Sequence, residues 1–323
     1  MPDIHGFRKE TMTEKGCATE LLSLAYGRLR EADLDGASAL LDDALSADFD
    51  SAEVLFALAC AAWWKERLAR LPGGTSAFER GEHALSQWKS FIAFQNRTPG
   101  DFEAARYAFK QFAFGIALRD FHAVSAEDAE TWEPELTLRI GRCLKGTGDF
   151  AGALERLEAA SRTRKDAPEI LAELADVYAL VNESRASKAL FREAFFLNPQ
   201  RIEIAFLESP AIVRLVEHLR GMGLHSPELE EWIPVHGSLL GIFTVKRELK
   251  PMEAGRLRQS IYELENEVKE NAGRRGLLAP RLINRYFWLI DHYINAKEDR
   301  ARIDEVLLKI RLMDPAVHRQ YVA

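Results

Sequence analysis

The sequence predicts an all-α protein in which antiparallel helical hairpins stack into a solenoid. The first observation is a 34-residue period: Pro134 and Pro168 each open a segment with apolar residues at helical spacing and a turn between two helices. The second is that small residues, Gly141 and Ala175, stand in register where the two helices would cross, which allows close approach. The third is Pro199, which follows the second segment and cannot continue its helix.

The elements before this pair are predicted in order from the N-terminus. Residues 1–17 are expected to form a flexible N-terminal segment. Residues 18–51 follow the same pattern of apolar and small residues, and residues 52–95 begin in register before a Pro-Gly-Gly loop displaces the second helix. An aromatic-rich, irregular hairpin is expected over residues 76–122.

The register between the two strongest segments extends through their second helices. Leu157 matches Phe191, and Ala160 matches Ala194. This pattern resembles the tetratricopeptide repeat (TPR) family, and the resemblance covers residues 18–199. It implies a right-handed superhelix in which the first helix of each repeat lines a concave groove that binds a protein or peptide.

The remaining portion, residues 200–323, is predicted to be divergent but mostly helical. Helices over 210–221 and 251–273 each open at proline and close at glycine, as helices tend to do. The tract 232–245 fits a short helix and an irregular segment equally well. The chain then ends in a TPR-like hairpin over 280–313. The middle of this portion is faintly similar to TPR proteins of spirochaetes.

The resemblance places a stripe of basic side chains in the groove. At the family's groove positions, the segment that opens at Pro134 carries Arg139, Arg142 and Lys145. Such stripes receive acidic peptides in the family's chaperone-binding members, where arginine and lysine hold carboxylate oxygens. Arg142 stands where those members have asparagine, so a clamp for chaperone tails is not implied. The groove is expected to bind an acidic protein or peptide and also to include Leu138, Tyr26 and Arg30.

A structural interpretation competes with ligand binding. The next segment carries Glu173 and Asp176 at corresponding positions, so Arg139 would face Glu173 and Arg142 would face Asp176 between stacked repeats. Lys145 has no acidic counterpart in this alignment. It is therefore expected to be solvated and is the best single candidate for a partner contact.

The helix predicted over 102–122 is apolar on two faces. If neighbouring helices flank it on both sides, both faces are buried. Otherwise one face is an exposed interface for a partner helix or for a second protomer of a homo-oligomer. The residues of that candidate aromatic interface are Tyr107, Phe114 and Phe121.

Composition excludes several classes of protein. The chain has 323 residues, 47% of them hydrophobic and 29% charged, which is typical of a folded globular protein. Charged residues interrupt every apolar run, so no membrane helix is expected. The three cysteines, Cys17, Cys60 and Cys143, are far apart and predict neither a disulfide framework nor a zinc site. A cytoplasmic protein is expected.

The distribution of charge and the lack of catalytic motifs narrow the set of functions that the sequence favours. The net charge is −7, and residues 1–55 hold 5 basic against 12 acidic residues while the remainder balances. No region has the basic surplus that nucleic-acid binding requires. No pattern indicates a catalytic nucleophile, a metal site or a cofactor. The sequence therefore favours a non-catalytic protein-binding scaffold or adaptor. The alternatives are a self-associating scaffold or regulator of a larger assembly, and an enzyme with its site in residues 200–278.

Overall fold

The protein is all-α, as predicted, over the part that the structure describes. This computed structural model describes residues 4–125, 128–130, 133, 135–246 and 248–323, with side chains from Gly16 onward, and every regular element among them is a helix. None of the described helices is both long enough and apolar enough to cross a membrane. The chain divides into two compact units, Met1–Arg156 and Leu157–Ala323.

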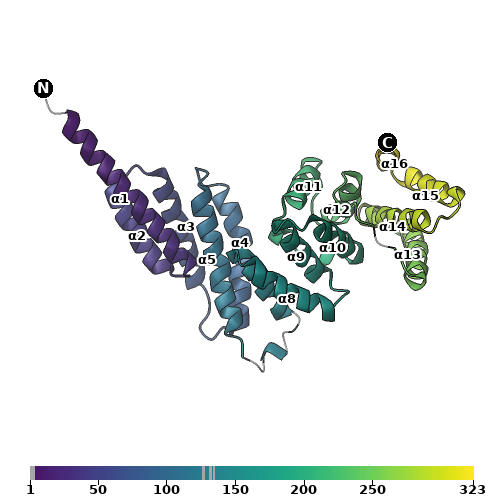
Figure 1. The fold of residues 1–323 in the computed structure, drawn as a ribbon, viewed down its shortest axis with the longest axis horizontal. Helices are drawn as coiled ribbons and strands as arrows, with labels where there is room; N and C mark the ends of the chain where they lie inside the picture. The colour runs from purple at the N-terminus through teal and green to yellow at the C-terminus, as the bar shows by residue number, and fades with distance from the viewer. Residues whose placement is uncertain (1–3, 126–127, 131–132, 134, 247) are drawn as a thin grey trace. The chain divides into compact units, whose positions relative to one another are not determined.

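The first unit is built from neighbouring helices that pack in pairs (Figure 1). Helix α1 packs on α2, α4 packs on α5, and α5 also contacts α7, α1 and α3. The last helix, α8, begins in this unit and ends in the next. The bounds are α1 Ile4–Arg30, α2 Leu34–Ala47, α3 Ala52–Ala69, α4 Ala77–Gln95, α5 Glu103–His122, α7 Glu135–Thr147 and α8 Phe150–Thr163.

Short-range signals set the helix ends of this unit. Ser76 and Glu79 form a reciprocal capping box at the start of α4, in which each side chain accepts a hydrogen bond from the other's backbone N–H. Gly148 follows α7 with φ +93°, as expected of a glycine that ends a helix. Helix α1 continues back to Ile4, through most of the N-terminal segment that is predicted to be flexible. Pro134, which opens the first repeat in the sequence pattern, lies outside the described residues.

The core of the first unit is aromatic. Trp64 of α3 is fully buried and lies edge-on against Phe112 of α5, with ring centroids 5.5 Å apart. Phe91 of α4 contacts both Trp64 and Phe109 at centroid distances of 5.3 and 5.7 Å. Edge-on and tilted pairs of this kind contribute beyond their buried area. The core therefore locks α3, α4 and α5 together.

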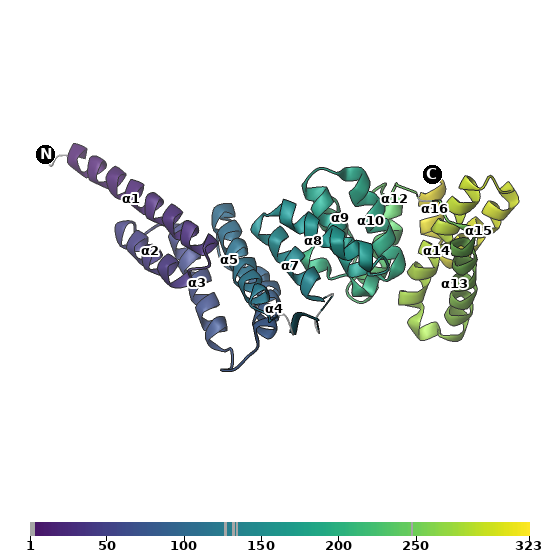
Figure 2. The ribbon, with the colours of Figure 1, turned by 60° about the horizontal axis from the view of Figure 1, so that its bottom comes forward.

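The second unit is also built from helices, several of which are joined by short turns (Figure 2). Helix α9 packs on α10, α12 packs on both α11 and α14, and α14 also packs on α13 and α15. The bounds are α9 Pro168–Leu180, α10 Ser184–Leu197, η1 Pro199–Arg201, η2 Ile204–Phe206, α11 Pro210–Gly221, α12 Glu228–Leu239, α13 Pro251–Glu270, η3 Ala272–Arg274, α14 Arg275–Asn295, α15 Arg300–Met313 and α16 Pro315–Val322.

The ambiguous tract 232–245 is helical as far as Leu239 and irregular over the rest. Helix α12 covers most of the ambiguous tract and contains Pro234 in its interior. Its apolar residue Ile233 is fully buried against Phe195 and Phe243 in one core cluster. Tertiary burial of that face outweighs the local cost of the proline, since most helical stability in proteins comes from packing.

A buried ion pair fixes α14. Asp291 occupies the place where the stronger repeats have a small crossing residue. The Asp291 carboxylate is paired with the Arg192 guanidinium of α10 and with Lys246. Arg192 also lies over the Trp288 ring, 4.6 Å from its centroid, and donates a hydrogen bond to the Val245 carbonyl. Charge pairing and a cation–π contact therefore connect α14 to α10 at this position.

Candidate protein-binding site

The structure places the basic stripe of α7 differently from the prediction. Arg142 and Lys145 are each 1% exposed, so neither is presented to solvent. The expectation that Lys145 is solvated is wrong, because a repeat alignment cannot show how deeply a groove position is buried. Arg139 donates from Nε to Glu82 of α4 at 2.6 Å, a partner that the alignment does not indicate.

The acidic residues of the next repeat are buried as well. Glu173 and Asp176 lie inside the protein. The Asp176 carboxylate accepts hydrogen bonds from the backbone N–H groups of Glu208 and Ser209, at distances of 2.7 to 3.0 Å. It therefore caps the backbone that leads into α11, a structural role that the sequence pattern does not reveal.

The other predicted groove residues are mostly enclosed. Leu138 is buried. Tyr26 is also buried, and its hydroxyl donates to Glu53 at 2.9 Å; burial and this acidic neighbour raise the pKa of Tyr26 above its usual value. Arg30 is exposed and donates to the Tyr26 carbonyl. Of these three residues, only Arg30 offers its side chain to a partner.

The structure also corrects the prediction of an aromatic interface on α5. Phe114 and Phe121 are buried, and their rings lie edge-on against Trp88 and Phe78 of α4 at centroid distances of 5.4 and 5.6 Å. Tyr107 alone of the three is exposed, at 49%. The physical reason is that α5 contacts α1, α3, α4 and α7, which cover both of its apolar faces.

Two glycines mark where these phenylalanines fit. A Cβ atom added at Gly146 of α7 would lie 2.2 Å from the Phe114 ring, and one added at Gly81 of α4 would lie 2.6 Å from the Phe121 ring. Both distances are far below van der Waals contact. The glycines in the facing helices are thus the sequence signal that could have indicated burial of this stripe.

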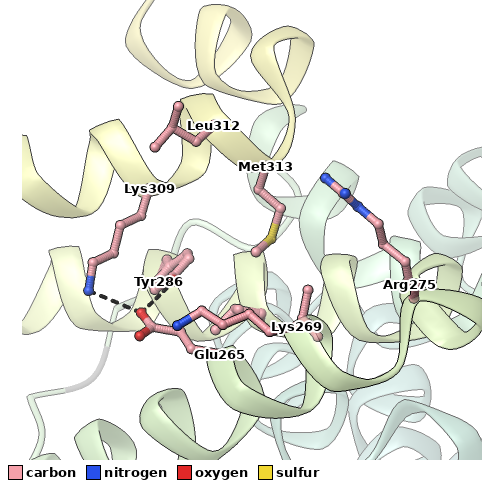
Figure 3. Close-up of a pocket in the computed structure, with 10 residues that line it drawn as sticks. Glu265, Lys269, Arg275, Tyr286, Lys309, Leu312 and Met313 are labelled. Atoms are coloured by element: carbon pink, nitrogen blue, oxygen red, sulfur yellow. Dashed lines mark hydrogen bonds and ion pairs between the residues drawn. The ribbon is translucent and has the colours of Figure 1, made fainter.

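A pocket in the second unit combines charged and apolar walls (Figure 3). It has a volume of about 480 Å³ and lies among the C-terminal half of α13, the first turns of α14 and the end of α15. This size is within the range of ligand-binding clefts. The residues that line it are Glu265, Val268, Lys269, Ala272, Arg275, Leu282, Tyr286, Lys309, Leu312 and Met313.

A hydrogen-bonded carboxylate organises one side of the pocket. Glu265 accepts hydrogen bonds from the Tyr286 hydroxyl at 2.7 Å and from Lys309 Nζ at 3.0 Å (Figure 3). Burial opposes ionisation of Glu265, but these hydrogen bonds and the charges of Lys309 and Lys269 together hold its pKa below the usual value. Glu265 is therefore negatively charged at neutral pH and fixes the position of Lys309.

The rest of the pocket is cationic and apolar. Lys269 and Arg275 are exposed at its rim, and no hydrogen bond or ion pair holds the Arg275 side chain within the described part of the chain. Counting Lys309, the wall has three cations against the single carboxylate of Glu265. Leu312 and Met313 supply an apolar surface beside them, and Leu312 is strongly exposed. The pocket thus suits an anionic group next to an apolar one.

The histidines of the middle tract do not form a metal site. Among the described residues, no group of three or more His, Cys, Asp or Glu side chains is placed to hold a metal ion. His225 and Glu228 line a hollow of about 320 Å³, but no hydrogen bond joins their side chains in the part of the chain described.

His236 makes stability depend on pH. It is buried in α12 against Trp232 and lies 6.2 Å from His218, measured between ring centroids. Burial and the neighbouring histidine hold the pKa of His236 below its usual value of 6.5. His236 therefore binds a proton more readily in the unfolded chain than in the folded chain. The free energy of unfolding should therefore fall as the pH drops below about 6.5.

This expectation is measured by urea unfolding at about pH 7.5 and about pH 5.5, with replacement of His236 by phenylalanine. H236F should show a smaller loss between the two pH values than the unchanged chain. The exposed His122, replaced in the same way, is the matched control and should leave the loss unchanged. An equal pH dependence in H236F and the unchanged chain would contradict the assignment.

No family model matches the chain, and no curated protein matches it.

Proposed function

We propose that this protein is a non-catalytic scaffold of TPR-like helical hairpins that binds a protein partner, and that the pocket among α13, α14 and α15 receives an acidic segment of that partner. The observation that carries the proposal is that one pocket is lined both by three cationic side chains and by an apolar wall. The paired helices α9 and α10, at the positions that the 34-residue pattern predicts, support a right-handed solenoid as the frame.

The pocket chemistry favours a peptide over other anions. A carboxylate can accept two parallel hydrogen bonds from the Arg275 guanidinium, and Lys269 adds a second positive charge. An apolar side chain beside that carboxylate would cover Leu312 and Met313, whose exposure to water is unfavourable. A phosphate backbone would meet the cations but leave the apolar wall uncovered. The segment bound is therefore an acidic one with a large apolar side chain.

The proposal predicts a specific effect of charge reversal on binding. The probe is a fluorescein-labelled peptide with an Asp-Phe-Asp core, titrated with the full chain and followed by fluorescence anisotropy. Arg275→Glu and Lys269→Glu should each weaken binding about tenfold or more, because each removes a charge-assisted hydrogen bond and adds repulsion. A peptide with Asn in place of Asp should bind more weakly to the unchanged chain.

The matched control lies on the same helix as Lys269. Arg258 is exposed on α13 but does not line the pocket, so Arg258→Glu makes the same change of charge at a different place. It should leave peptide binding nearly unchanged. Failure of the unchanged chain to bind the peptide, or equal weakening by Arg258→Glu and Arg275→Glu, would contradict a binding role for this pocket.

A further inference from the structure

An exposed aromatic side chain stands in the most acidic part of the chain. Phe49, in the turn between α2 and α3, is 72% exposed. The surrounding residues 31–53 include eight Asp or Glu and neither Lys nor Arg. Removing this ring from water would be favourable, so Phe49 can serve as an apolar anchor for a partner surface.

Four of these carboxylates have neither a cationic nor a hydroxyl partner in the part of the chain that the structure describes: Asp42, Asp43, Asp48 and Asp50. Asp48 accepts only a hydrogen bond from the backbone N–H of Asp50, at 3.3 Å. Two of the four therefore directly flank Phe49. The other four are already engaged within the first unit: Glu31 with Arg28, Asp33 with the Gly36 backbone, Asp35 with Lys65, and Glu53 with Tyr26.

This turn has the chemistry that the pocket lacks. The pocket has two more cations than carboxylates and an uncovered apolar wall, and the turn has uncompensated carboxylates on both sides of an exposed phenyl ring. We propose that the partner is a second copy of this chain, whose Phe49 turn docks into the pocket among α13, α14 and α15. Phe49 covers Met313 and Leu312, and the flanking carboxylates bind Arg275 and Lys269. This inference rests on the proposed function, because it names the occupant of the same pocket.

Charge dictates which surfaces of the two copies meet. A pocket facing a second pocket would bring Arg275 and Lys269 against their own copies, and a turn facing a second turn would bring carboxylate against carboxylate. Contact between unlike surfaces avoids both repulsions. Such a contact is heterologous. A dimer held by one contact still has one unused turn and one unused pocket, so the assembly grows head to tail or closes into a ring.

The contact is expected to be weak and sensitive to salt. A single turn seated in one pocket buries less than the about 1,200 Å² of a stable interface, so association should be measurable only at high protein concentration. Exposed charge pairs are screened at about 10 Å in 0.1 M salt, so added salt should dissociate the assembly.

Sedimentation velocity of the full chain tests this proposal. The mean mass should rise as the protein concentration increases from about 10 to about 500 μM at low salt, and fall on addition of about 0.5 M salt. Phe49→Ser removes the apolar anchor of the turn, and Arg275→Glu replaces a carboxylate-binding cation of the pocket with an anion. Each variant alone should therefore remain monomeric. Leu24→Ser is the matched control: Leu24 is 59% exposed on α1, and its loss should leave association unchanged.

Mixing the two variants gives the decisive result. A Phe49→Ser chain still has its pocket, and an Arg275→Glu chain still has its turn, so the mixture should form a dimer that grows no further. A full chain that remains monomeric at every concentration overturns the inference, as does a mixture that remains monomeric. If the chain is monomeric and Phe49→Ser strengthens binding of the Asp-Phe-Asp peptide, the turn occupies the pocket of its own chain, which also overturns it.

The peptide titration separates this inference from the proposed function. Peptide binding that is lost in Arg275→Glu, together with a monomeric chain, leaves the pocket as a protein-binding site and removes only the second copy as its partner. Absence of peptide binding removes both. Circular dichroism of Phe49→Ser and Arg275→Glu should match the unchanged chain, because both side chains are exposed.

Discussion

Replacing Asp291 with alanine is expected to lower the free energy of unfolding by about 3 to 5 kcal/mol. Asp291 is buried in α14 and pairs with Arg192 of α10, which is also buried. Arg192 pairs with no other carboxylate in the described part of the chain. Removal of the carboxylate leaves the Arg192 guanidinium inside the protein without its counter-charge. The cation–π contact with Trp288 and the hydrogen bond to the Val245 carbonyl remain, but they cannot neutralise it.

Urea unfolding at neutral pH measures this loss, and Asp304→Ala is the control. Asp304 accepts from Arg300 at 3.0 Å on the surface of α15, where both side chains are exposed. The exposed pair should contribute only about 0.3 to 0.5 kcal/mol. A chain in which Arg192 and Asp291 are both replaced by apolar residues should recover part of the stability lost in Asp291→Ala. Similar losses for Asp291→Ala and Asp304→Ala would contradict the buried ion pair.

Truncation of the buried phenylalanines of α5 is the second change with a large expected effect. Phe112→Ala, Phe114→Ala and Phe121→Ala should each cost about 3 to 5 kcal/mol, the range for removing a buried aromatic ring. Each ring lies against another aromatic ring of the first unit. Tyr107→Ala should cost less than about 1 kcal/mol, because that side chain is half exposed.

The measurement is again urea unfolding, combined with light scattering at the same protein concentrations. All three phenylalanine variants should lose stability at unchanged molecular mass. The steric fit gives an independent check, since Gly146→Ala pushes a methyl group into the Phe114 ring and should also destabilise the protein. If Phe114→Ala were as stable as the unchanged chain but changed the mass of the assembly, Phe114 would belong to an intermolecular interface and not to the core.

Local patterns in the sequence predicted the helices well. Helix α11 spans 210–221 as predicted, because Pro210 and Gly221 mark its ends directly. Ser76 with Glu79 and the positive φ of Gly148 likewise depend on a few neighbouring residues. The all-α class followed from the same short-range periodicity. These properties are encoded within one or two helical turns, so a single sequence suffices to read them.

Burial and charge pairing depended on contacts between distant parts of the chain. The sequence pattern assigned Lys145 and Phe114 to particular helix faces. It could not show that other helices bury those faces. Asp291 meets Arg192 ninety-nine positions away, and no spacing rule connects them. Each of these environments is created by helices that meet only when the chain folds.

The candidate pocket shows the same division between sequence and tertiary structure. Glu265 and Lys309 are 44 positions apart and lie on α13 and α15, while Tyr286 joins them from α14. In the sequence they are ordinary charged and aromatic residues of three amphipathic helices. The sequence by itself determined where the helices form and how the acidic residues are distributed along the chain. Only packing decided which charges became buried partners and which remained at the rim of a pocket, because the cost of burying a charge depends on the groups that surround it in three dimensions.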